Sequence, residues 1–371
     1  MRILQLTKSY PPDLGGIESV TFDLTEGINK RGLVCDVLCA NNGNRTIKEN
    51  RGTYRIIRAA SLGKVWSASV APVLVYYLWK WRKAYDIIHL HTPDPMNMLA
   101  FFLVRPKAKL VVHWHSDIVK QKKAFFFFLP LQNWILKRAD VVVGTTEKYI
   151  AHSTQLRNFR PKSVAIPIGI DAGERFEEGG VKEIRDRHRG KKIVFSLGRL
   201  VYYKGFEYLI EAGTFLEEDI VVLIGGAGKL EGKLKGQIEA LGLGDRVILL
   251  GRIPAAELEN YFKASDVFCL PSIAVSEAFG VVMLEAMKYG RPIVATDIPL
   301  SGVGWVNAHG VTGLNVVVKN AHALAGAINE LTRGDLFYTS CSANAKKRFL
   351  EFFVSDKMVS AFLELYRSIT E

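Results

Sequence analysis

The sequence predicts an α/β protein of two domains, each built around a parallel β-sheet. Its 371 residues, of which 49% are hydrophobic, are more than one small core needs. In the first half, short apolar runs alternate with amphipathic stretches, which is the rhythm of repeated strand–helix units. That rhythm restarts at Lys192, after a charged segment that contains glycine. We therefore expect two doubly wound sheets that bind ligand at the carboxyl ends of their strands, in the cleft between the domains.

The predicted strands divide between the two domains. An N-terminal domain is expected over residues 1–172, with strands at residues 2–6, 35–39, 54–58, 86–91, 109–113, 139–143 and 164–167. A C-terminal domain is expected over residues 173–350, with strands at 192–197, 220–224, 246–250, 267–270, 292–295 and 313–317. Residues 169–190 are assigned to the linker and domain edge. The last segment, residues 351–371, has the apolar spacing of one helix from Glu351 to Thr370.

Positive charge is concentrated in the first half of the chain. The first 172 residues contain 25 Lys and Arg against 12 Asp and Glu, which gives a net charge of +13. The other 199 residues contain 24 basic and 25 acidic side chains, a net charge of −1. The asymmetry predicts an anionic surface or polymer as a partner of the N-terminal domain.

Cysteine usage indicates a reducing compartment. The chain has four cysteines, Cys35, Cys39, Cys269 and Cys341, which are too few for a disulfide framework. Cys35 and Cys39 flank a predicted strand, so buried free thiols are expected there rather than metal ligands. The N-terminus has no signal-peptide pattern, and we expect a cytoplasmic protein.

The segment from Ser276 to Asp297 contains two carboxylates in a suggestive position. Glu277 and Glu285 lie eight residues apart, about 12 Å along a helix axis, which is close to the sugar-to-ribose distance in a nucleotide-sugar. Between them, Phe279, Gly280 and Val281 form a loop that opens an apolar helix. Free N–H groups at that point would face an anion such as a diphosphate. Because burial of an unpaired carboxylate costs several kcal/mol, each acid is expected to have a partner.

Two cations and two glycine clusters follow predicted strands of the C-terminal domain. Arg199 and Lys204, after Gly198, lie at a strand end where fixed positive charge can neutralise a diphosphate leaving group without a metal. The cluster from Gly225 to Gly228, with Gly226 at its centre, has no partner acid at the spacing of a dinucleotide fingerprint. Close approach to a donor phosphate or base is therefore expected instead.

The N-terminal domain offers a glycine pair and several histidines. Gly15 and Gly16 precede a helix, which favours close backbone approach to a ligand, while the role of Glu18 is open between surface charge and acceptor contact. Alternation along a strand sends His113 and His115 to one face, with Asp117 at the strand end. His89 and His91 with Asp94 form a second group. Acceptor binding is the hypothesis for this group, and a metal site is not expected.

Several motifs together carry a family resemblance. They are Gly198-Arg199, Lys204-Gly205, Gly225-Gly226-Ala227-Gly228, the Glu277 and Glu285 pair, Pro292–Thr296, Gly15-Gly16-Ile17-Glu18, His115 and Ile166–Asp171. Their order and spacing cover essentially the whole chain, which resembles the retaining glycosyltransferases of family 4. One departure is that Tyr202 and Tyr203 precede the lysine, where the family usually has an acid nearby.

The resemblance implies a fold, a mechanism and residue roles. It implies the GT-B architecture, in which two Rossmann-like domains face each other across a cleft and a C-terminal helix crosses back to the N-terminal domain. It also implies a metal-independent, front-face transfer with no cofactor, in which a nucleotide-sugar is the substrate. The implied catalytic group is His115, Arg199, Lys204 and Glu277. The implied donor contacts are Gly15, Gly16, Gly198, Gly226, Arg252, Phe279, Gly280, Val281 and Glu285, and His113, Asp117 and Glu18 remain as acceptor or unassigned positions.

Aromatic residues lie beside clustered cations in two segments of the N-terminal domain. Lys120–Lys123 precedes Phe125–Phe128, and the uncharged run from Trp66 to Trp79 precedes three cations that end at Lys83. Neither run reaches the roughly 18 to 20 apolar residues that span a bilayer. Buried helices explain part of both runs, and Phe125–Phe128 fits either core or membrane. The cations predict peripheral binding to an anionic inner leaflet, and no motif supports a nucleic-acid partner.

The leading hypothesis is a hexosyltransferase of cell-surface polysaccharide synthesis. The first half resembles mannosyl- and rhamnosyltransferases of O-antigen or lipopolysaccharide assembly, which favours GDP-mannose as donor and a lipid-linked saccharide as acceptor. A UDP-sugar is the alternative donor. An epimerase of the same architecture acting on UDP-N-acetylglucosamine is a second enzyme class. A non-catalytic binder of anionic polymers is the third hypothesis, which the presence of Arg199, Lys204, Glu277 and Glu285 together disfavours.

Overall fold

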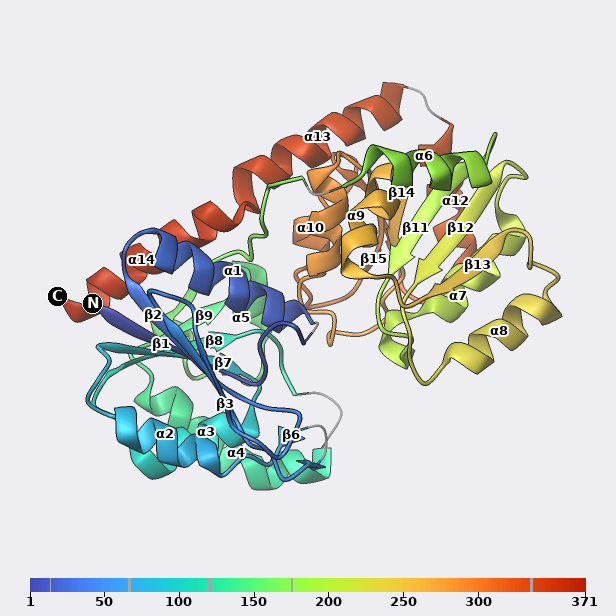
Figure 1. Ribbon diagram of the computed structural model, residues 1–371. Coiled ribbons are helices and arrows are strands. Elements are labelled where there is room, and N and C mark those ends of the chain that lie inside the picture. The colour runs from blue at the N-terminus through green and yellow to red at the C-terminus, as the bar shows by residue number, and fades with distance from the viewer. Residues whose placement is uncertain (14, 66–67, 119–121, 175, 334–335) are drawn as a thin grey trace. The chain divides into compact units, whose positions relative to one another are not determined.

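The chain folds into two compact units, each with its own sheet (Figure 1). The computed structural model describes all residues except 14, 66–67, 119–121, 175 and 334–335, and it also omits the side chains of 65, 68 and 122–127. One unit, the N-terminal domain, contains Met1–Asp171 and Val354–Glu371, and the other, the C-terminal domain, contains Ala172–Phe353. The expected boundaries at residues 172 and 350 lie one and three residues from these limits. The expectation of two Rossmann-like α/β domains is confirmed.

An eight-stranded sheet forms the centre of the N-terminal domain, in the order β10-β9-β8-β7-β1-β2-β4-β3. All neighbours are parallel except the edge strand β3, which is antiparallel to β4 and which the sequence pattern did not predict. The strand order reverses between β1 and β7, which makes their carboxyl ends the expected ligand position. The strands are β1 (Arg2–Thr7), β2 (Val34–Ala40), β3 (Ile47–Asn50), β4 (Arg55–Ala59), β7 (Ile87–Thr92), β8 (Lys109–Trp114), β9 (Val141–Gly144) and β10 (Ser163–Ala165), with a separate pair β5 (Lys64–Val65) and β6 (Ala68–Ser69).

Helices cover both faces of this sheet (Figure 1). On one face lie α2 (Val73–Trp81), α3 (Pro95–Val104) and α4 (Lys122–Arg138), and on the other lie α1 (Gly16–Lys30), α5 (Glu147–His152) and α14 (Ser355–Thr370), with a short turn η1 (Arg160–Lys162) before β10. The last helix, α14, packs against α1, where the guanidinium of Arg31 lies 2.6 Å from the carboxylate of Asp356. The final segment of the chain therefore completes the N-terminal core.

The helix expected from Glu351 to Thr370 is present from Ser355 to Thr370, but its expected start is wrong. The helix α13 (Leu336–Phe352) ends before Phe353, and α14 starts anew at Ser355. Val354 leaves the helical conformation, with φ −80° and ψ 133°, and forms a parallel bridge with Ile170. The break exists because the backbone of Val354 pairs with a neighbouring strand-like segment rather than with its own helix, which a helical spacing of apolar residues cannot show.

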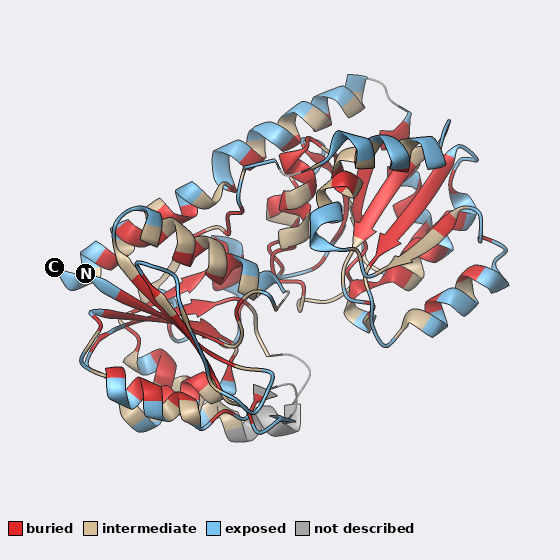
Figure 2. Ribbon diagram, in the orientation of Figure 1, coloured by how far each residue is buried: buried red, intermediate tan, exposed pale blue. Residues whose placement is uncertain are grey.

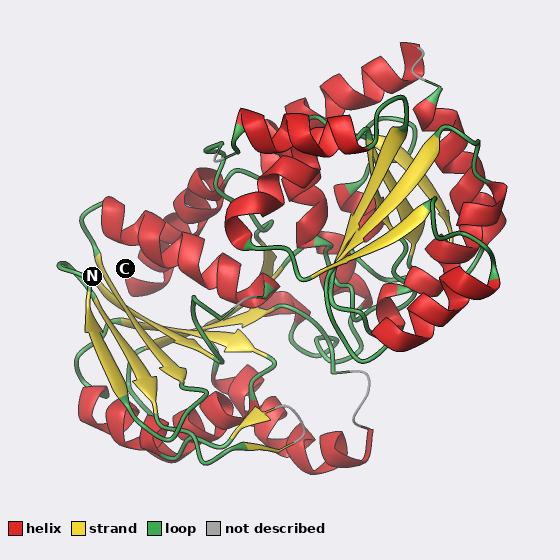
Figure 3. Cartoon of the chain, turned by 45° about the vertical axis from the view of Figure 1, so that its right-hand side comes forward, coloured by secondary structure: helices red, strands yellow, loops and turns green. Residues whose placement is uncertain are grey.

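A six-stranded, fully parallel sheet forms the C-terminal domain, in the order β13-β12-β11-β14-β15-β16. This order also reverses at its middle, between β11 and β14. The strands are β11 (Lys192–Leu197), β12 (Ile220–Gly225), β13 (Val247–Gly251), β14 (Val267–Leu270), β15 (Ile293–Asp297) and β16 (Gly313–Val317). Figure 2 shows the central strands of both sheets as buried, and Figure 3 shows helices around each sheet. Every strand predicted for this domain is present within two residues.

Eight helices and two short turns surround this second sheet in the part of the chain that is described. They are α6 (Glu178–Arg187), η2 (Tyr202–Lys204), α7 (Phe206–Ala212), η3 (Gly213–Phe215), α8 (Glu231–Ala240), α9 (Ala255–Ala264), α10 (Val281–Lys288), α11 (Val303–Val306), α12 (Ala321–Thr332) and α13. The linker expected over residues 169–190 is in large part the helix α6. Its Arg185 guanidinium forms two hydrogen bonds, 2.9 and 3.0 Å long, to the carboxylate of Asp266, which fixes this helix to the domain.

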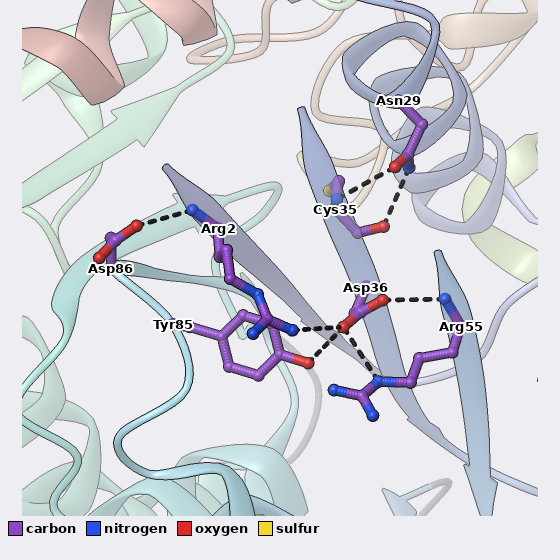
Figure 4. Close-up of polar contacts among 7 residues, drawn as sticks. All are labelled: Arg2, Asn29, Cys35, Asp36, Arg55, Tyr85 and Asp86. Carbon is purple, nitrogen blue, oxygen red and sulfur yellow. Dashed lines mark hydrogen bonds and ion pairs between the residues drawn. The ribbon is translucent and has the colours of Figure 1, made fainter. Parts of the chain in front are cut away.

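The amino edge of the N-terminal sheet is held by a buried carboxylate (Figure 4). Asp36 on β2 accepts hydrogen bonds from the backbone N–H and Nε of Arg55, at 2.8 and 3.1 Å, and from the hydroxyl of Tyr85 at 2.6 Å. The guanidinium of Arg2 lies 3.9 Å away. Burial, followed by the bond to Asp36, raises the pKa of Tyr85, so this hydroxyl stays a donor. The group joins the starts of β1, β2 and β4, and we name it the Asp36 cluster.

Candidate active site

The carboxyl edge of the C-terminal sheet collects the residues that the sequence predicts for donor binding. Gly198 and Arg199 follow β11, Gly226 follows β12, Arg252 follows β13, and the loop with Glu277 follows β14. Parallel strands end at one edge of a sheet, and this edge includes the reversal between β11 and β14. The topology therefore brings together four segments that are far apart in the sequence.

The centre of this edge is a buried ion pair between Lys204 and Glu277. The Lys204 ammonium donates to Oε2 of Glu277 at 2.5 Å, and the side chains are 10% and 12% exposed. The hydroxyl of Ser272 donates to the same Oε2 at 3.0 Å. Ser301 fixes the loop by donating to the Glu277 carbonyl at 2.5 Å. The expectation that the buried acid has a partner is confirmed, although the sequence did not indicate that the partner is the lysine 73 residues earlier.

The glycines of this edge are required by close backbone approach. Gly226 has φ +133°, and a Cβ added there would lie 1.9 Å from the carbonyl oxygen of Gly198. At Gly205, with φ +65°, a Cβ would lie 2.1 Å from the carbonyl oxygen of Pro271. No other residue type fits such positions without displacing main chain. The loops after β11, β12 and β14 are thus packed backbone against backbone, which keeps Lys204 in place beside Glu277.

Two arginines of the edge are exposed. Arg199 donates from Nη2 to the hydroxyl of Tyr203 at 3.1 Å, so this tyrosine supports the cation. Arg252 is exposed after the left-handed Gly251. Both guanidinium groups are exposed and can reach a ligand anion in solvent, whereas Lys204 is buried and paired with Glu277.

The helix α10 begins at Val281, and the preceding Gly280 adopts φ 78° and ψ 49° as its N-cap. The first-turn N–H groups of a helix have no intrahelical acceptor, and those near Val281 point along the helix start. Glu285 lies one turn inside the helix and is half-buried, as expected. The Phe279 ring packs near Trp305 and Phe353, so only its backbone is placed to meet a ligand.

In the N-terminal domain, the Gly15–Gly16 loop opens α1. The Glu18 carboxylate lies over Gly15, where an added Cβ would be 2.2 Å from its Oε2, and it accepts a 2.6 Å hydrogen bond from Ser9. A carboxylate at a helix start repels a phosphate and attracts hydroxyl donors. This geometry suits contact with a sugar hydroxyl better than contact with a diphosphate.

Four imidazoles form one stack on the sheet, which we name the histidine stack. His89 and His91 lie on β7, His113 lies on β8, and His115 follows it. The register pairs His91 with His113, and alternation turns all four to the same face. Ring centroids lie 4.6 Å apart for His89 and His91 and 4.0 Å apart for His113 and His115. The expectation that His113 and His115 share a face is confirmed.

Burial keeps the four imidazoles neutral. It lowers the pKa of His89, His91 and His113 well below the ordinary value, with neighbouring histidines adding to the effect, and it lowers the pKa of His115 to about 3. Neutral imidazole can accept as well as donate a hydrogen bond. A role of His115 as a positive charge in the resting protein is thus disfavoured.

Two acids near the stack have structural roles. Oδ1 of Asp117 accepts hydrogen bonds from Trp114 at 2.8 Å, from Tyr149 at 3.1 Å and from Ser153 at 2.7 Å. Asp94 caps α3, and its burial raises its pKa to about 6. Both oxygens of Asp94 accept hydrogen bonds from its own helix, whereas the three bonds to Asp117 all end on Oδ1.

Sequence reasoning missed three polar residues of these sites. Ser272 and Ser301 support Glu277, and Gln5 in the middle of β1 contacts His91. The sequence could have indicated Gln5, because an amide side chain within an apolar strand is buried and needs hydrogen-bond partners. The two serines carried no such signal, because they lie in loops.

No described helix is long and apolar enough to cross a bilayer. All four cysteines are buried and free, as predicted. Lys120–Lys123 and Phe125–Phe127 lie outside the described side chains, and Phe128 is half-buried. The two exposed aromatics of α2, Tyr76 and Trp79, are each 53% exposed.

The two domains match two family models, which together cover most of the chain. Residues 14–174 match the model described as Glycosyltransferase Family 4, and residues 181–348 match the model described as Glycosyl transferases group 1. The fold, the glycine-lined carboxyl edge and these matches define a glycosyltransferase. The chain belongs to the family-4 glycosyltransferases with the GT-B fold.

Two curated relatives align along nearly the full length. The chain is 30% identical to O-antigen chain mannosyltransferase C of Escherichia coli over 373 residues, covering 100% of this chain and 99% of that protein. It is also 30% identical to the D-rhamnosyltransferase WbpZ of Pseudomonas aeruginosa over 364 residues, covering 96% of this chain and 93% of that protein.

Solved structures share the architecture. Sucrose-phosphate synthase from Thermosynechococcus elongatus superposes with a TM-score of 0.81 at 22% identity, covering 99% of this chain and 98% of that one. Anabaena HepE in complex with UDP and glucose gives a TM-score of 0.78 at 21% identity, covering 99% of this chain and 100% of that one. At these identities the likeness concerns the fold alone.

Proposed function

We propose that this glycosyltransferase moves mannose from GDP-mannose to a lipid-linked saccharide in lipopolysaccharide or cell-surface polysaccharide synthesis. The observation that carries the proposal is the buried pair of Lys204 and Glu277 at the carboxyl edge, in a chain that aligns end to end with an O-antigen mannosyltransferase. A UDP-sugar is the alternative donor. Base choice would depend on the backbone after β12 and β13, near Gly226 and Arg252.

The ion pair leaves suitable groups for both parts of a donor. The Lys204 ammonium has three N–H donors. One of them donates a hydrogen bond to Glu277, so two remain for a diphosphate oxygen. Both hydrogen bonds that Glu277 accepts through its carboxylate, from Lys204 and Ser272, end on Oε2. Among the described residues its Oε1 is left for a sugar hydroxyl. Glu285 is assigned to the ribose hydroxyls, and neither acid to nucleophilic attack.

The proposed reaction is a metal-independent transfer with retention. Arg199 and Lys204 stabilise the charge that grows on the leaving diphosphate as the glycosidic bond breaks. The departing phosphate takes the proton of the acceptor hydroxyl, which attacks from the same side of the sugar. The protein then contributes placement and charge, with His115 as the proposed contact to the sugar on the N-terminal domain.

Donor identity is tested by thermal shift with GDP, UDP and their sugars. A donor at 100 times its Kd stabilises the folded state by about 2.7 kcal/mol, so the correct nucleotide raises Tm measurably. We expect the largest shift with GDP-mannose. A larger shift with UDP-sugars would replace the donor, and no shift with any nucleotide-sugar would contradict the proposed function.

Turnover is tested with two cation variants and one acid variant. Arg199→Ala should reduce kcat about 100-fold while the exposed site lets the protein fold normally. Lys204→Ala should abolish transfer, and Glu285→Ala should weaken donor binding. Lys235→Ala on α8, which removes an exposed cation paired with Glu231 at 3.1 Å, is the matched control and should leave kcat unchanged. Normal transfer in the three site variants would rule out these roles.

A surface on α2 and α3 supports peripheral membrane association. Tyr76, Trp79 and Leu103 are 53%, 53% and 57% exposed, and they line one shallow hollow together with Arg82. A second hollow shares Arg82 and is lined also by Lys83, Lys107, Lys109 and Asp86. Exposed aromatics beside cations match an anionic bilayer interface, where a lipid-linked acceptor would be found.

Vesicle flotation tests the membrane proposal. The protein should bind vesicles that contain anionic phospholipid and should bind neutral vesicles less. Leu103→Ser should weaken binding, whereas Leu336→Ser, at an 89% exposed leucine of the C-terminal domain, should not. Equal binding to both vesicle types would remove the electrostatic part of the proposal.

A further inference from the structure

The histidine stack contains a hydrogen-bonded chain that reaches His115. Nε2 of His91 lies 2.9 Å from Oε1 of Gln5, and Nδ1 of His91 lies 2.9 Å from Nε2 of His115. All three side chains are buried, at 0%, 1% and 7% exposure. In a buried chain of hydrogen bonds such as this one, each bond needs one donor and one acceptor. The role of one atom therefore determines the role of the next, and the position of each proton follows.

The proton positions follow from the amide oxygen of Gln5. An amide oxygen only accepts, so Nε2 of His91 must carry a proton and donate it. Since the His91 ring is neutral, its Nδ1 is unprotonated and accepts from Nε2–H of His115. The neutral ring of His115 then has an unprotonated Nδ1. Among the described residues this nitrogen has no hydrogen-bond partner.

The surroundings of Gln5 and His91 support this order. The Gln5 amide nitrogen points to Sγ of Cys35 at 3.5 Å, which keeps its oxygen toward His91. Thr21 lies 3.4 Å from Nδ1 of His91, but its hydroxyl proton goes to the carbonyl of Ile17 at 2.8 Å. Thr21 therefore does not compete with His115 as the donor to Nδ1.

A metal ion is a poorer explanation of the stack. One ring nitrogen each from His89, His91 and His113 lies within 4.8 Å of the others. However, the planes of His89 and His91 are parallel within 9° at a 4.6 Å separation, and imidazole lone pairs lie in the ring plane. Stacked rings do not direct two lone pairs to one ion at about 2.1 Å. Both nitrogens of His91 are also occupied by the hydrogen bonds above.

We propose that Gln5 and His91 are positioning residues that hold His115 as its Nε2–H tautomer, with Nδ1 presented as a hydrogen-bond acceptor. An acceptor nitrogen fits a hydroxyl group of the donor sugar. The use made of that nitrogen rests on the proposed function, whereas the tautomer itself does not. Gln5 and His91 act through His115 and are not expected to touch substrate.

The tautomer is measured directly by NMR on protein with ¹⁵N-labelled histidine rings at neutral pH. The ¹⁵N shifts separate protonated from unprotonated ring nitrogens, and His115→Gln and His91→Gln variants assign the signals. We expect the Nε2–H form for both His91 and His115. A proton on Nδ1 of either ring would overturn the proposal, whether or not the protein transfers any sugar.

The positioning role is tested with substitutions at Gln5. Gln5→Met keeps the length of the side chain but has no acceptor oxygen, so His115 should become a mixture of tautomers. We expect kcat to fall about tenfold, the value of one hydrogen bond, with the donor KM nearly unchanged. Gln5→Glu keeps an acceptor oxygen and should retain both the tautomer and most of the activity.

The matched control is Gln132→Met, because Gln132 is a second buried amide of the same domain with no hydrogen-bond partner for either amide atom among the described residues. It should change neither the NMR signals nor kcat. If Gln5→Met shifts the tautomer but leaves kcat as in Gln132→Met, the positioning role is overturned. If the wild-type protein transfers no sugar, the proposed function fails while the NMR result still stands.

Discussion

The N-terminal sheet buries polar side chains toward both ends of its strands, but the two groups differ in how fully they are hydrogen-bonded. At the amino edge, the Asp36 cluster surrounds one carboxylate with donors from Arg55 and Tyr85 (Figure 4). Toward the carboxyl ends, both ring nitrogens of His113 and Nε2 of His89 are buried without a hydrogen-bond partner among the residues that the structure describes. Complete hydrogen bonding marks a structural cluster, whereas incomplete hydrogen bonding is expected near a functional site.

The largest expected effect is acid sensitivity of the histidine stack. Unfolded histidine takes up a proton near pH 6.5, while burial lowers the pKa of these four rings in the folded state. Below pH 6.5 the unfolded state thus binds more protons, and stability falls as the pH falls. Four such groups remove about 5 kcal/mol of stability between pH 7.5 and 5.5.

Urea unfolding at several pH values, followed by domain-specific probes, measures this loss. The C-terminal domain is the internal control, since its three histidines, His188, His309 and His322, are half-buried or exposed. Its transition should move much less than that of the N-terminal domain. If both unfolding transitions shift equally with pH, the acid sensitivity does not come from the histidine stack.

A smaller loss is expected when the Asp36 cluster is broken. Asp36→Leu leaves the Tyr85 hydroxyl and the Arg55 N–H without acceptors and should cost about 3 kcal/mol of unfolding free energy. The guanidinium groups remain half-exposed, so they can be hydrated, which limits the loss. The nucleotide binding proposed for the C-terminal domain should persist in the folded variant.

The matched variant for Asp36 is Asp86→Asn at the same edge. Asp86 is 57% exposed and accepts a 2.7 Å hydrogen bond from the backbone of Arg2. Its replacement should change the unfolding free energy by less than about 0.5 kcal/mol. A similar loss in both variants would mean that burial of Asp36 does not matter.

The smallest effect is a gain at His113. His113→Phe keeps a ring between His115 and Phe362 and removes two buried nitrogens that have no partner in the described part of the chain. At pH 7.5 we expect the unfolding free energy to rise by about 1 kcal/mol. Below pH 6.5 the unfolding free energy should fall less steeply with falling pH, because unfolding of the variant takes up about one proton fewer. Destabilisation in urea unfolding would show that His113 has a polar partner that this arrangement does not account for.

The sequence predicts many of the strands and faces that carry these two polar clusters, but it does not predict which side chains contact each other. The strands and the shared face of His113 and His115 follow from apolar runs and alternation. The stack itself depends on the register of β7 against β8, and the role of Gln5 depends on β1 lying beside β7. Periodicity within one segment carries no information on such pairing. The edge strand β3 was missed for a related reason, since three of its four residues are polar or charged.

The carboxyl edge of the C-terminal sheet shows the same limit. The spacing of Glu277 and Glu285 indicated one loop and one helix, and both are present. The contact between Lys204 and Glu277 depends on β11 and β14 being neighbours although β12 and β13 intervene in the sequence. Only the strand order of the folded sheet reveals it.

The position of α14 has a consequence for synthesis on the ribosome. Phe362 and Tyr366 are fully buried in the N-terminal domain, and the Tyr366 hydroxyl lies 2.5 Å from Nδ1 of His89, 277 residues earlier. During translation the core of the N-terminal domain therefore stays incomplete, with its histidines uncovered, until α14 has been synthesised after the C-terminal domain. The C-terminal domain can close first, so the order of folding is expected to run against the order of translation.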